Sequence, residues 1–328
     1  MKLKQKFTKN ILMRIGVPRM MHMIDKQKSI VNLPDSLSST SNSPRRFEIQ
    51  LEAAKMMRER EDFEMRHTFP MTRMFSIMKN IDLSVDSLSK NPSKPSINAT
   101  SDFIETLGEF ARKIGLSHIG YVKLPRDLIF QGFGVTYDNA IVLAMEMDEV
   151  KISKAPSQDT MNMVFGTYDE LGIATNRIAT YLREQGYAAQ ADHPLGGLVL
   201  FPPLAQRAGI GWVGKHGLLI TQEYGPRVRL AAVYTSIHNL PFFERNIHDW
   251  IGEYCKVCGL CIKQCPTNAI LEEPVKHETG LTTHTRQRAC FEYFVKFYGC
   301  SVCVKACPFS KSGDTYERLK AIVERTGE

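Results

Sequence analysis

Apolar side chains recur at helical spacing in two segments of the chain. One segment runs from 102 to 114 and ends at Gly115, and the other runs from Gly166 to Gln185 and ends at Gly186. The inward positions are Phe103, Leu107, Phe110 and Ile114 in the first, and Leu171, Ile178 and Leu182 in the second. Spacings of three and four residues place side chains on one face, and glycine commonly ends a helix. Both segments are therefore predicted to be amphipathic helices.

Shorter apolar runs between 98 and 245 predict buried strands. These runs cover residues 118–122, 140–145, 218–221 and 228–237. A short helix is predicted at 204–208, and a closing helix at 314–325. The succession of helices and strands predicts an α/β layer with a central sheet, and an α+β class for the whole chain.

The first 97 residues differ from the rest and are predicted to form a partly irregular N-terminal extension. They are rich in Met and basic residues, and Ser/Pro-rich stretches at 37–44 and 89–95 are typical of linkers. The segment 47–66 is dense in Glu, Arg, Ala and Met, which indicates either a charged helix lying on the body or a loosely attached arm. Two further domains are predicted, an α/β domain at 98–245 and a cysteine-rich domain at 246–328.

Composition and charge exclude few classes of protein. The 328 residues exceed the ~100–200 of a typical single domain, and the 43% hydrophobic content is that of a globular protein. A net charge of +7 permits contact with an anionic partner without identifying one. No apolar run reaches the ~18 residues that a membrane span needs. Arg45-Arg46 is followed by charged positions, which disfavours an export signal, so a cytoplasmic or membrane-peripheral location is expected.

Eight cysteines, all in the last quarter of the chain, carry the strongest chemical signal. They form two sets that end alike: Cys255-x2-Cys258-x2-Cys261-x3-Cys265-Pro, then Cys290 and Cys300-x2-Cys303-x3-Cys307-Pro. In two-cluster ferredoxins the cysteine before proline ligates the other cluster. The spacing therefore predicts two [4Fe–4S] clusters with crossed ligation. The first would be held by Cys255, Cys258, Cys261 and Cys307, and the second by Cys265, Cys290, Cys300 and Cys303.

Zinc and disulfides are the alternatives for these cysteines. Paired C-x2-C segments do bind zinc, but a run of four followed by proline is typical of ferredoxins. Disulfides require an oxidising compartment, and the N-terminal sequence MKLKQKFTKNILMRIG lacks the apolar core and cleavage site of a secretory signal. Both alternatives fit the pattern less well than clusters do.

A glycine-rich segment precedes the cysteines. Four glycines, Gly209, Gly211, Gly214 and Gly217, fall within nine residues. Glycines allow the backbone to approach a flat ligand closely, and the backbone amides could meet the polar rim of that ligand. The first three also match a dinucleotide-binding spacing, but they follow a predicted helix instead of a strand, which disfavours a Rossmann site.

Together these motifs resemble one known group of proteins. Before the cysteine sets the chain reads Pro203-Leu-Ala, Ala208-Gly-Ile-Gly, Gly214-Lys-His-Gly-Leu-Leu-Ile-Thr and Glu223-Tyr-Gly-Pro-Arg-Val-Arg. Residues 98–312 resemble the cobalamin-dependent iron–sulfur reductases, which comprise reductive dehalogenases and the epoxyqueuosine reductases that act on tRNA. Two segments are more similar to the dehalogenases, namely Glu223–Arg229 and Ala289-Cys-Phe-Glu-Tyr-Phe. A third segment, Gly211-Trp-Val-Gly-Lys, is similar to the tRNA-modifying branch.

The resemblance implies a nitroreductase-like core that holds cobalamin base-off, with a C-terminal ferredoxin-like domain that reduces it. No side chain need coordinate the cobalt in that arrangement. Asp192-His193 lacks the spacing of an Asp-x-His-x-x-Gly signature, so His193 is either a pocket-lining residue or a solvent-facing loop residue. The cofactor-binding candidates are His193, Gly209, Gly211, Gly214, Lys215, His216 and Gly217.

The same resemblance implies catalytic roles for a tyrosine and an arginine. Tyr168 corresponds to the proton donor and is expected near a helix N-terminus, after Gly166-Thr167, where the helix dipole would favour phenolate. The alternative is a half-buried helix residue. Arg227 and Arg229 alternate with Val228, so on a strand they would share a face. At least one is expected to stabilise the developing anion, and the other could be a surface ion-pair partner.

The leading interpretation is a reductase that dehalogenates a small organic substrate, fed by an electron donor such as ferredoxin or flavodoxin. Removal of oxygen from an epoxide on a tRNA base is the alternative within the same superfamily. A non-catalytic electron carrier that reduces the corrinoid of a partner is the alternative outside enzymes.

Overall fold

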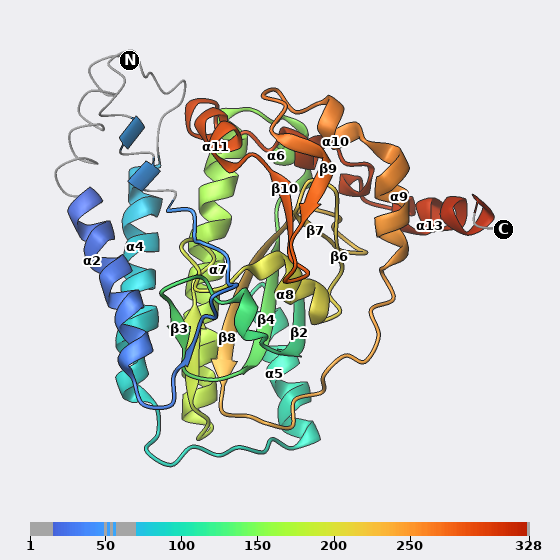
Figure 1. Cartoon of the computed structure of the whole chain (residues 1–328). Helices are drawn as coiled ribbons and strands as arrows, with labels where there is room; N and C mark the ends of the chain where they lie inside the picture. The colour runs from blue at the N-terminus through green and yellow to red at the C-terminus, as the bar shows by residue number, and fades with distance from the viewer. Residues whose placement is uncertain (1–15, 49–50, 53–54, 57–69, 327–328) are drawn as a thin grey trace.

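A four-stranded antiparallel sheet lies at the centre of the computed structural model, which describes residues 16–48, 51–52, 55–56 and 70–326 (Figure 1). The strands are β2 (His118–Lys123), β4 (Asn139–Glu146), β8 (Val228–Thr235) and β5 (Ala189–Asp192), in the order β2-β4-β8-β5. The central pair is in register over eight residues, with Leu143 opposite Ala231. The predicted α+β class is confirmed.

Two helices cover one face of this sheet. They are α5 (Ser101–Lys113) and α7 (Gln158–Glu184). Leu107 of α5 and Ile178 of α7 pack against Ile141 and Val233 of the sheet in one apolar cluster. On the opposite face, α8 (Phe201–Arg207) joins a second cluster through Leu204. Since every strand alternates its side chains, both faces of β4 and β8 are buried, which explains their continuous apolar sequences.

The helix α7 begins earlier than the sequence pattern predicted. It starts at Gln158, and the side chain of Ser157 caps it by accepting a hydrogen bond from the Thr160 backbone N–H. Tyr168 thus lies about three turns into the helix. Because a helix dipole acts within the first turn, the expectation that it would favour a Tyr168 phenolate is wrong.

Two N-terminal helices lie side by side along α7 (Figure 1). They are α2 (Val17–Lys28) and α4 (Met71–Asp86). Ile77 of α4 is fully buried in a Met-rich apolar cluster, and Asn176 of α7 donates a hydrogen bond to the Asn80 carbonyl oxygen. The described part of the N-terminal extension is therefore packed on the body. The charged helix predicted at 47–66 falls largely outside the described residues.

Short elements lie in the connections between the larger helices and strands. The strand β1 (Leu37–Ser38), within the predicted first linker, pairs with β3 (Gly134–Val135). The 3-10 helices are η2 (Ser29–Asn32), η3 (Ser87–Lys90) and η4 (Arg126–Leu128), and α6 (Glu149–Ser153) precedes α7.

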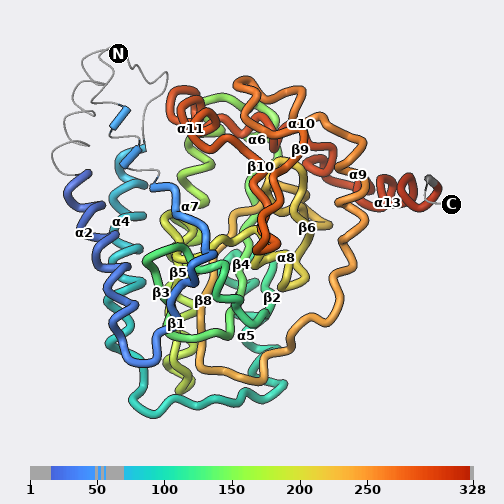
Figure 2. Tube along the Cα trace, in the orientation of Figure 1, coloured from blue at the N-terminus to red at the C-terminus, as the bar shows by residue number. Residues whose placement is uncertain are grey.

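The cysteine-rich segment forms a lobe of short helices beside the sheet domain. Its elements are α9 (Trp250–Cys258), α10 (Leu260–Lys263), β9 (Ile270–Lys276), β10 (Thr282–Thr285), α11 (Gln287–Lys296), α12 (Val302–Ala306), η5 (Pro308–Ser310) and α13 (Thr315–Thr326). The connection from β8 to α9 runs around the outside of the molecule (Figure 2). Within the described ranges, no helix combines the length and apolarity needed to cross a bilayer.

Candidate functional site

The cysteine lobe brings the eight thiols together in two groups. Cys255 and Cys258 lie on α9, and Cys261 lies on α10. The short helices α10 and α12 are in contact, so the end of α12 places Cys307 beside these three residues. All eight cysteines are free thiols rather than disulfides.

The thiols that raise the pKa of Cys307 and of Cys290 belong to the predicted crossed sets, while the pKa of Cys303 is raised by thiols of both sets. Burial raises the pKa of Cys307 well above its usual value, and Cys255, Cys261 and Cys258 raise it further. Burial and then the nearby Cys300 and Cys265 raise the pKa of Cys290 to about 11. Each cysteine before a proline is thus grouped with the opposite C-x2-C set, which is the arrangement that crossed ligation requires.

The thiol environments fit iron–sulfur clusters. Burial, with its neighbours contributing, raises the pKa of Cys255 to about 11, so this thiolate needs a nearby cation to form at neutral pH. Iron supplies such a charge. For Cys265, burial raises the pKa, but backbone N–H groups of Thr267, Ile270 and Ala269 outweigh it and lower the pKa. The Ala269 N–H donates to the Cys265 sulfur at 3.2 Å. Amide donors of this kind stabilise the sulfur ligands of a cluster.

Two of the predicted catalytic residues, Tyr168 and Arg229, lie against each other. Tyr168 projects from the middle of α7, and Arg229 lies on β8. The Arg229 guanidinium carbon lies 3.8 Å from the centroid of the Tyr168 ring, which is cation–π geometry. Tyr168 and Cys303 both pack against one apolar cluster, whose buried members include Phe165. Both the Tyr168 and the Arg229 side chains are only partly buried.

The Arg229 guanidinium has one nitrogen without a hydrogen-bond partner in the described part of the chain. One of its terminal nitrogens lies 3.2 Å from the Met147 sulfur. Its Nε is buried and has no hydrogen-bond partner among the described residues. A buried donor without a partner is costly, so this nitrogen is suited to bind an anionic or hydrogen-bonding group at the site.

Arg227 has a structural role instead of facing the same site. Arg227 immediately precedes β8, and its guanidinium has other partners than that of Arg229. The Arg227 side chain is fully buried, and its guanidinium donates to the carbonyl oxygens of Met147 and Ser310. Further partners are the Glu146 carboxylate at 2.7 Å, the Glu149 carboxylate at 3.4 Å and the Ser312 hydroxyl at 3.1 Å. Arg227 therefore ties the cysteine lobe to the sheet domain.

Replacing Arg227 with Met should lower the free energy of unfolding by about 3 kcal/mol, because two buried carbonyl oxygens would lose their donor. Urea unfolding of the purified protein would measure this. Arg288→Met is the matched control, since Arg288 is exposed and forms an ion pair with Glu292 at the surface, so its replacement should cost less than about 1 kcal/mol. Equal losses for the two variants would contradict the structural role.

The predicted cofactor residue His193 is buried, which corrects the alternative of a solvent-facing loop. Burial lowers the pKa of His193 to about 4, so the ring is neutral at pH 7. Its Nδ1 accepts a hydrogen bond from the Leu195 backbone N–H, and its Nε2 has no partner in the described part of the chain. A Cβ added to Gly172 would lie 2.0 Å from Nε2, so the ring packs directly on α7.

The predicted glycine-rich loop packs against protein at all four glycines. A Cβ added to Gly209 would meet the Phe243 ring at 2.6 Å, and one added to Gly211 would meet the Ile220 carbonyl oxygen at 2.2 Å. One added to Gly214 or Gly217 would approach Ile220 or His284 to within 3 Å. The need for glycine at these positions is therefore explained by close packing inside the chain, without a flat ligand. In the same loop, burial lowers the pKa of His216 to about 4.

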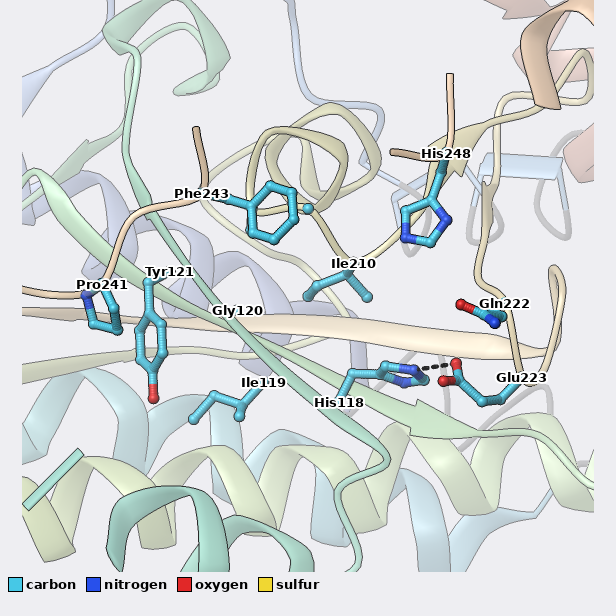
Figure 3. A pocket seen from close by; sticks show the side chains of 12 residues that line it. His118, Ile119, Gly120, Tyr121, Ile210, Gln222, Glu223, Pro241, Phe243 and His248 are labelled. Carbon is cyan, nitrogen blue, oxygen red and sulfur yellow. Dashed lines mark hydrogen bonds and ion pairs between the residues drawn. The ribbon is translucent and has the colours of Figure 1, made fainter. Parts of the chain in front are cut away.

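A cavity of about 220 Å³ that the sequence pattern did not predict lies at the edge strand β2 (Figure 3). Its lining includes Tyr121, Phe243 and His248, together with an ion pair in which His118 Nε2 lies 2.6 Å from a Glu223 carboxylate oxygen. Segments distant in sequence form it, so no local pattern signalled it. Tyr168 and Arg229 are not among its lining residues.

Comparison with known proteins supports the two-cluster lobe. Residues 254–311 match the family described as "4Fe-4S dicluster domain". Tetrachloroethene reductive dehalogenase of Desulfitobacterium hafniense is 32% identical over 188 residues, covering 53% of this chain and 33% of that protein. Epoxyqueuosine reductase of Listeria monocytogenes is 35% identical over 118 residues, covering 34% and 30%. The chain thus spans about a third of the length of these relatives.

Solved structures support the fold as a whole. The structure of the catabolic reductive dehalogenase NpRdhA has a TM-score of 0.69 and 16% identity, and the match covers 89% of this chain and 46% of that one. At this identity the likeness establishes the fold alone. In sequence the chain is similar to both branches of the superfamily, and the match to the reductive dehalogenases covers more of it.

The implied corrinoid fits only part of the predicted site. The cavity at β2 is smaller than the ~300–1,000 Å³ of pockets for drug-sized ligands, and a corrinoid is larger than such ligands. The glycine-rich loop is filled by protein side chains. The residues that do fit a bound group are Arg229, with its unpartnered Nε, and the adjoining Tyr168.

Proposed function

We propose, from the similarity of this chain to the reductive dehalogenases, that it is an iron–sulfur, corrinoid-dependent reductase acting on a small organohalide. The observation that carries the proposal is the Tyr168–Arg229 pair. It brings together an acid and a cation, and Tyr168 packs against the same apolar cluster as the predicted ligand Cys303. Reductive removal of halide needs a proton, a group that stabilises negative charge and a source of electrons.

The overall reaction takes up two electrons and one proton. The carbon–halogen bond breaks, a carbon–hydrogen bond forms and halide leaves, with one electron supplied by each cluster. A corrinoid, when bound, would supply the reduced cobalt that attacks or ligates the substrate. Tyr168 and the predicted ligand Cys303 of the second cluster pack against the same apolar cluster. We therefore expect electrons to enter at the first cluster and to reach the site through the second.

Tyr168 and Arg229 have distinct roles in this proposal. The Tyr168 hydroxyl donates the proton to the carbon that loses halide. The Arg229 guanidinium, lying over the Tyr168 ring, stabilises the negative charge that the phenolate then carries. Its unpartnered Nε–H is also placed to hold an anionic group at the site.

Anaerobic purification with metal analysis tests the proposal. We expect about eight irons and one cobalt per chain after reconstitution, with halide released from an organohalide when reduced methyl viologen is supplied. Two substrates suit this assay. Tetrachloroethene is the substrate in the name of the similar Desulfitobacterium hafniense enzyme, and 3-bromo-4-hydroxybenzoic acid is bound in a structure of NpRdhA. Iron without cobalt would instead support an electron carrier. Salt-sensitive tRNA binding with epoxide removal would support the tRNA-modifying alternative.

A further inference from the structure

Met147 directly follows β4 and lies where the sheet domain, α7 and the cysteine lobe meet. Its side chain is 4% exposed and belongs to the Met-rich apolar cluster. The buried members of this cluster also include Phe165 of α7 and Val304 of α12. In addition to this packing, the Met147 sulfur has a polar contact.

The contact joins the Met147 sulfur to the guanidinium of Arg229. One terminal nitrogen of Arg229 donates to this sulfur at 3.2 Å, while the guanidinium carbon lies 3.8 Å from the centroid of the Tyr168 ring. A cation–π interaction depends chiefly on the distance of the charge above the ring, so it leaves the guanidinium free to turn in its own plane. The contact with the sulfur fixes that orientation.

A thioether suits this task because it is a weak, uncharged acceptor. It orients an arginine without cancelling the charge, whereas a carboxylate in the same place would form an ion pair with it. The positive charge of Arg229 therefore remains available to an anionic group at the site. The same holds for its Nε–H, which has no partner in the described part of the chain.

Arg227 fixes the Met147 backbone at both its donor and its acceptor. The Met147 N–H donates to the Arg227 carbonyl oxygen at 2.7 Å, and the Arg227 guanidinium donates to the Met147 carbonyl oxygen at 3.0 Å. The same guanidinium donates to the carbonyl oxygen of Ser310 in the cysteine lobe at 2.7 Å. The position of the Met147 sulfur therefore does not depend on apolar packing alone.

We propose that Met147 is a positioning residue for the proposed reaction, because its sulfur holds the Arg229 guanidinium over the Tyr168 ring while Arg227 holds Met147. This role rests on the proposed function, since it concerns the same Tyr168–Arg229 pair. Met147 itself does not touch the substrate. Arg227, Met147 and Arg229 form one chain of contacts that leads from the cysteine lobe to the proposed site.

Met147→Leu tests the role of the sulfur. The substitution removes the acceptor and keeps a side chain of similar volume, so iron content and the urea midpoint should stay close to those of the parent protein. In a crystal structure of the variant, we expect the Arg229 guanidinium to leave the Tyr168 ring or to occupy several conformations. In halide release with reduced methyl viologen, kcat should fall about tenfold with KM unchanged, since misplacement of a catalytic group acts on the transition state.

Met147→Gln separates positioning from packing. Glutamine is close to methionine in length and offers its amide oxygen to Arg229, but its amide nitrogen would be buried in the apolar cluster. We therefore expect lower stability than in Met147→Leu together with a higher kcat. If kcat instead followed stability through the series, Met147 would be only a packing residue and the proposal would be overturned.

Met163→Leu is the matched control, because Met163 is 6% exposed in the same apolar cluster. It should keep the parent kcat and the parent position of Arg229. An equal loss of kcat in this control, or an unmoved Arg229 in Met147→Leu, would overturn the proposal. If Met147→Leu does not fold, Met147→Ile, which also lacks the sulfur, takes its place with the same expectations.

The crystal structures need neither cobalamin nor substrate. A parent protein that binds iron normally but releases no halide would disprove the proposed reaction. The position of Arg229 in the Met147 variants would still decide whether the sulfur holds the guanidinium.

Discussion

Cys307→Ala is expected to remove one whole cluster, about four of eight irons, and the loss should be the cluster of the first cysteine set. Cys307 follows the second set in sequence, but its thiol is coupled to Cys255, Cys258 and Cys261. Alanine cannot ligate iron, and a cubane cluster that keeps only three protein thiolates is expected to dissociate from the protein. Iron analysis and electron paramagnetic resonance would measure the effect.

Double variants distinguish crossed from uncrossed ligation. If Cys307 and Cys258 serve one cluster, Cys258→Ala/Cys307→Ala should lose no more iron than either single variant, because the effects of residues that act as one unit are not additive. Cys303→Ala/Cys307→Ala should lose both clusters. The reverse pattern, with both clusters lost from the Cys258 and Cys307 pair, would contradict the crossed sets.

The two-cluster character of the cysteine segment, which the family match over residues 254–311 supports, could be predicted from sequence because the information is local. Spacings of two and three residues between thiols, followed by proline, constrain the chain whatever surrounds it. The same holds for α5, where the apolar spacing and Gly115 predicted a helix from 102 to 114 and the structure has Ser101–Lys113. The strands β2 and β4 were predicted for a similar reason, since their apolar runs are short and bounded.

The roles of the arginines could not be predicted, because they depend on which distant segments pack around each side chain. Alternation on a strand predicted that Arg227 and Arg229 point the same way. The Arg227 guanidinium instead donates to the buried carbonyl oxygens of Met147 and Ser310, whereas the Arg229 guanidinium lies over the Tyr168 ring. These partners come from segments far apart in the sequence, which local alternation does not reveal.

The reason for the glycines of the glycine-rich loop could not be predicted from sequence either. A glycine is required where a ligand approaches the backbone and also where another part of the chain does, and the sequence cannot distinguish these cases. Here the neighbours are Phe243, Ile220 and His284, two of which lie in segments that follow the loop by more than twenty residues. The predicted cofactor loop is thus better interpreted as a contact between the sheet domain and the cysteine lobe.

The residues proposed for the chemistry lie outside the cysteine lobe. Tyr168 lies on α7 and Arg229 on β8, whereas the predicted cluster ligands lie between Cys255 and Cys307. Loss of chemistry should therefore be separable from loss of iron.

Tyr168→Phe should therefore lower kcat for halide release by about 10²–10⁴-fold, the usual contribution of a positioned acid, without changing iron content or cluster potentials. The substitution removes only the hydroxyl group. The ring that lies 3.8 Å from the Arg229 guanidinium carbon remains, so the cation–π contact and the packing of α7 are kept. Steady-state halide release with reduced methyl viologen gives kcat and KM separately, and loss of a proton donor should appear mainly in kcat.

Tyr121→Phe is the control, because Tyr121 lines the cavity at β2 and is not near the proposed chemistry. It should retain the parent kcat. Arg229→Met should lower kcat by a comparable factor to Tyr168→Phe, and the double variant should be little worse than either one, since the two side chains act as a unit. If Tyr168→Phe kept the parent rate while Arg229→Met abolished it, the proton would have to come from another group, and Arg229 alone would define the site.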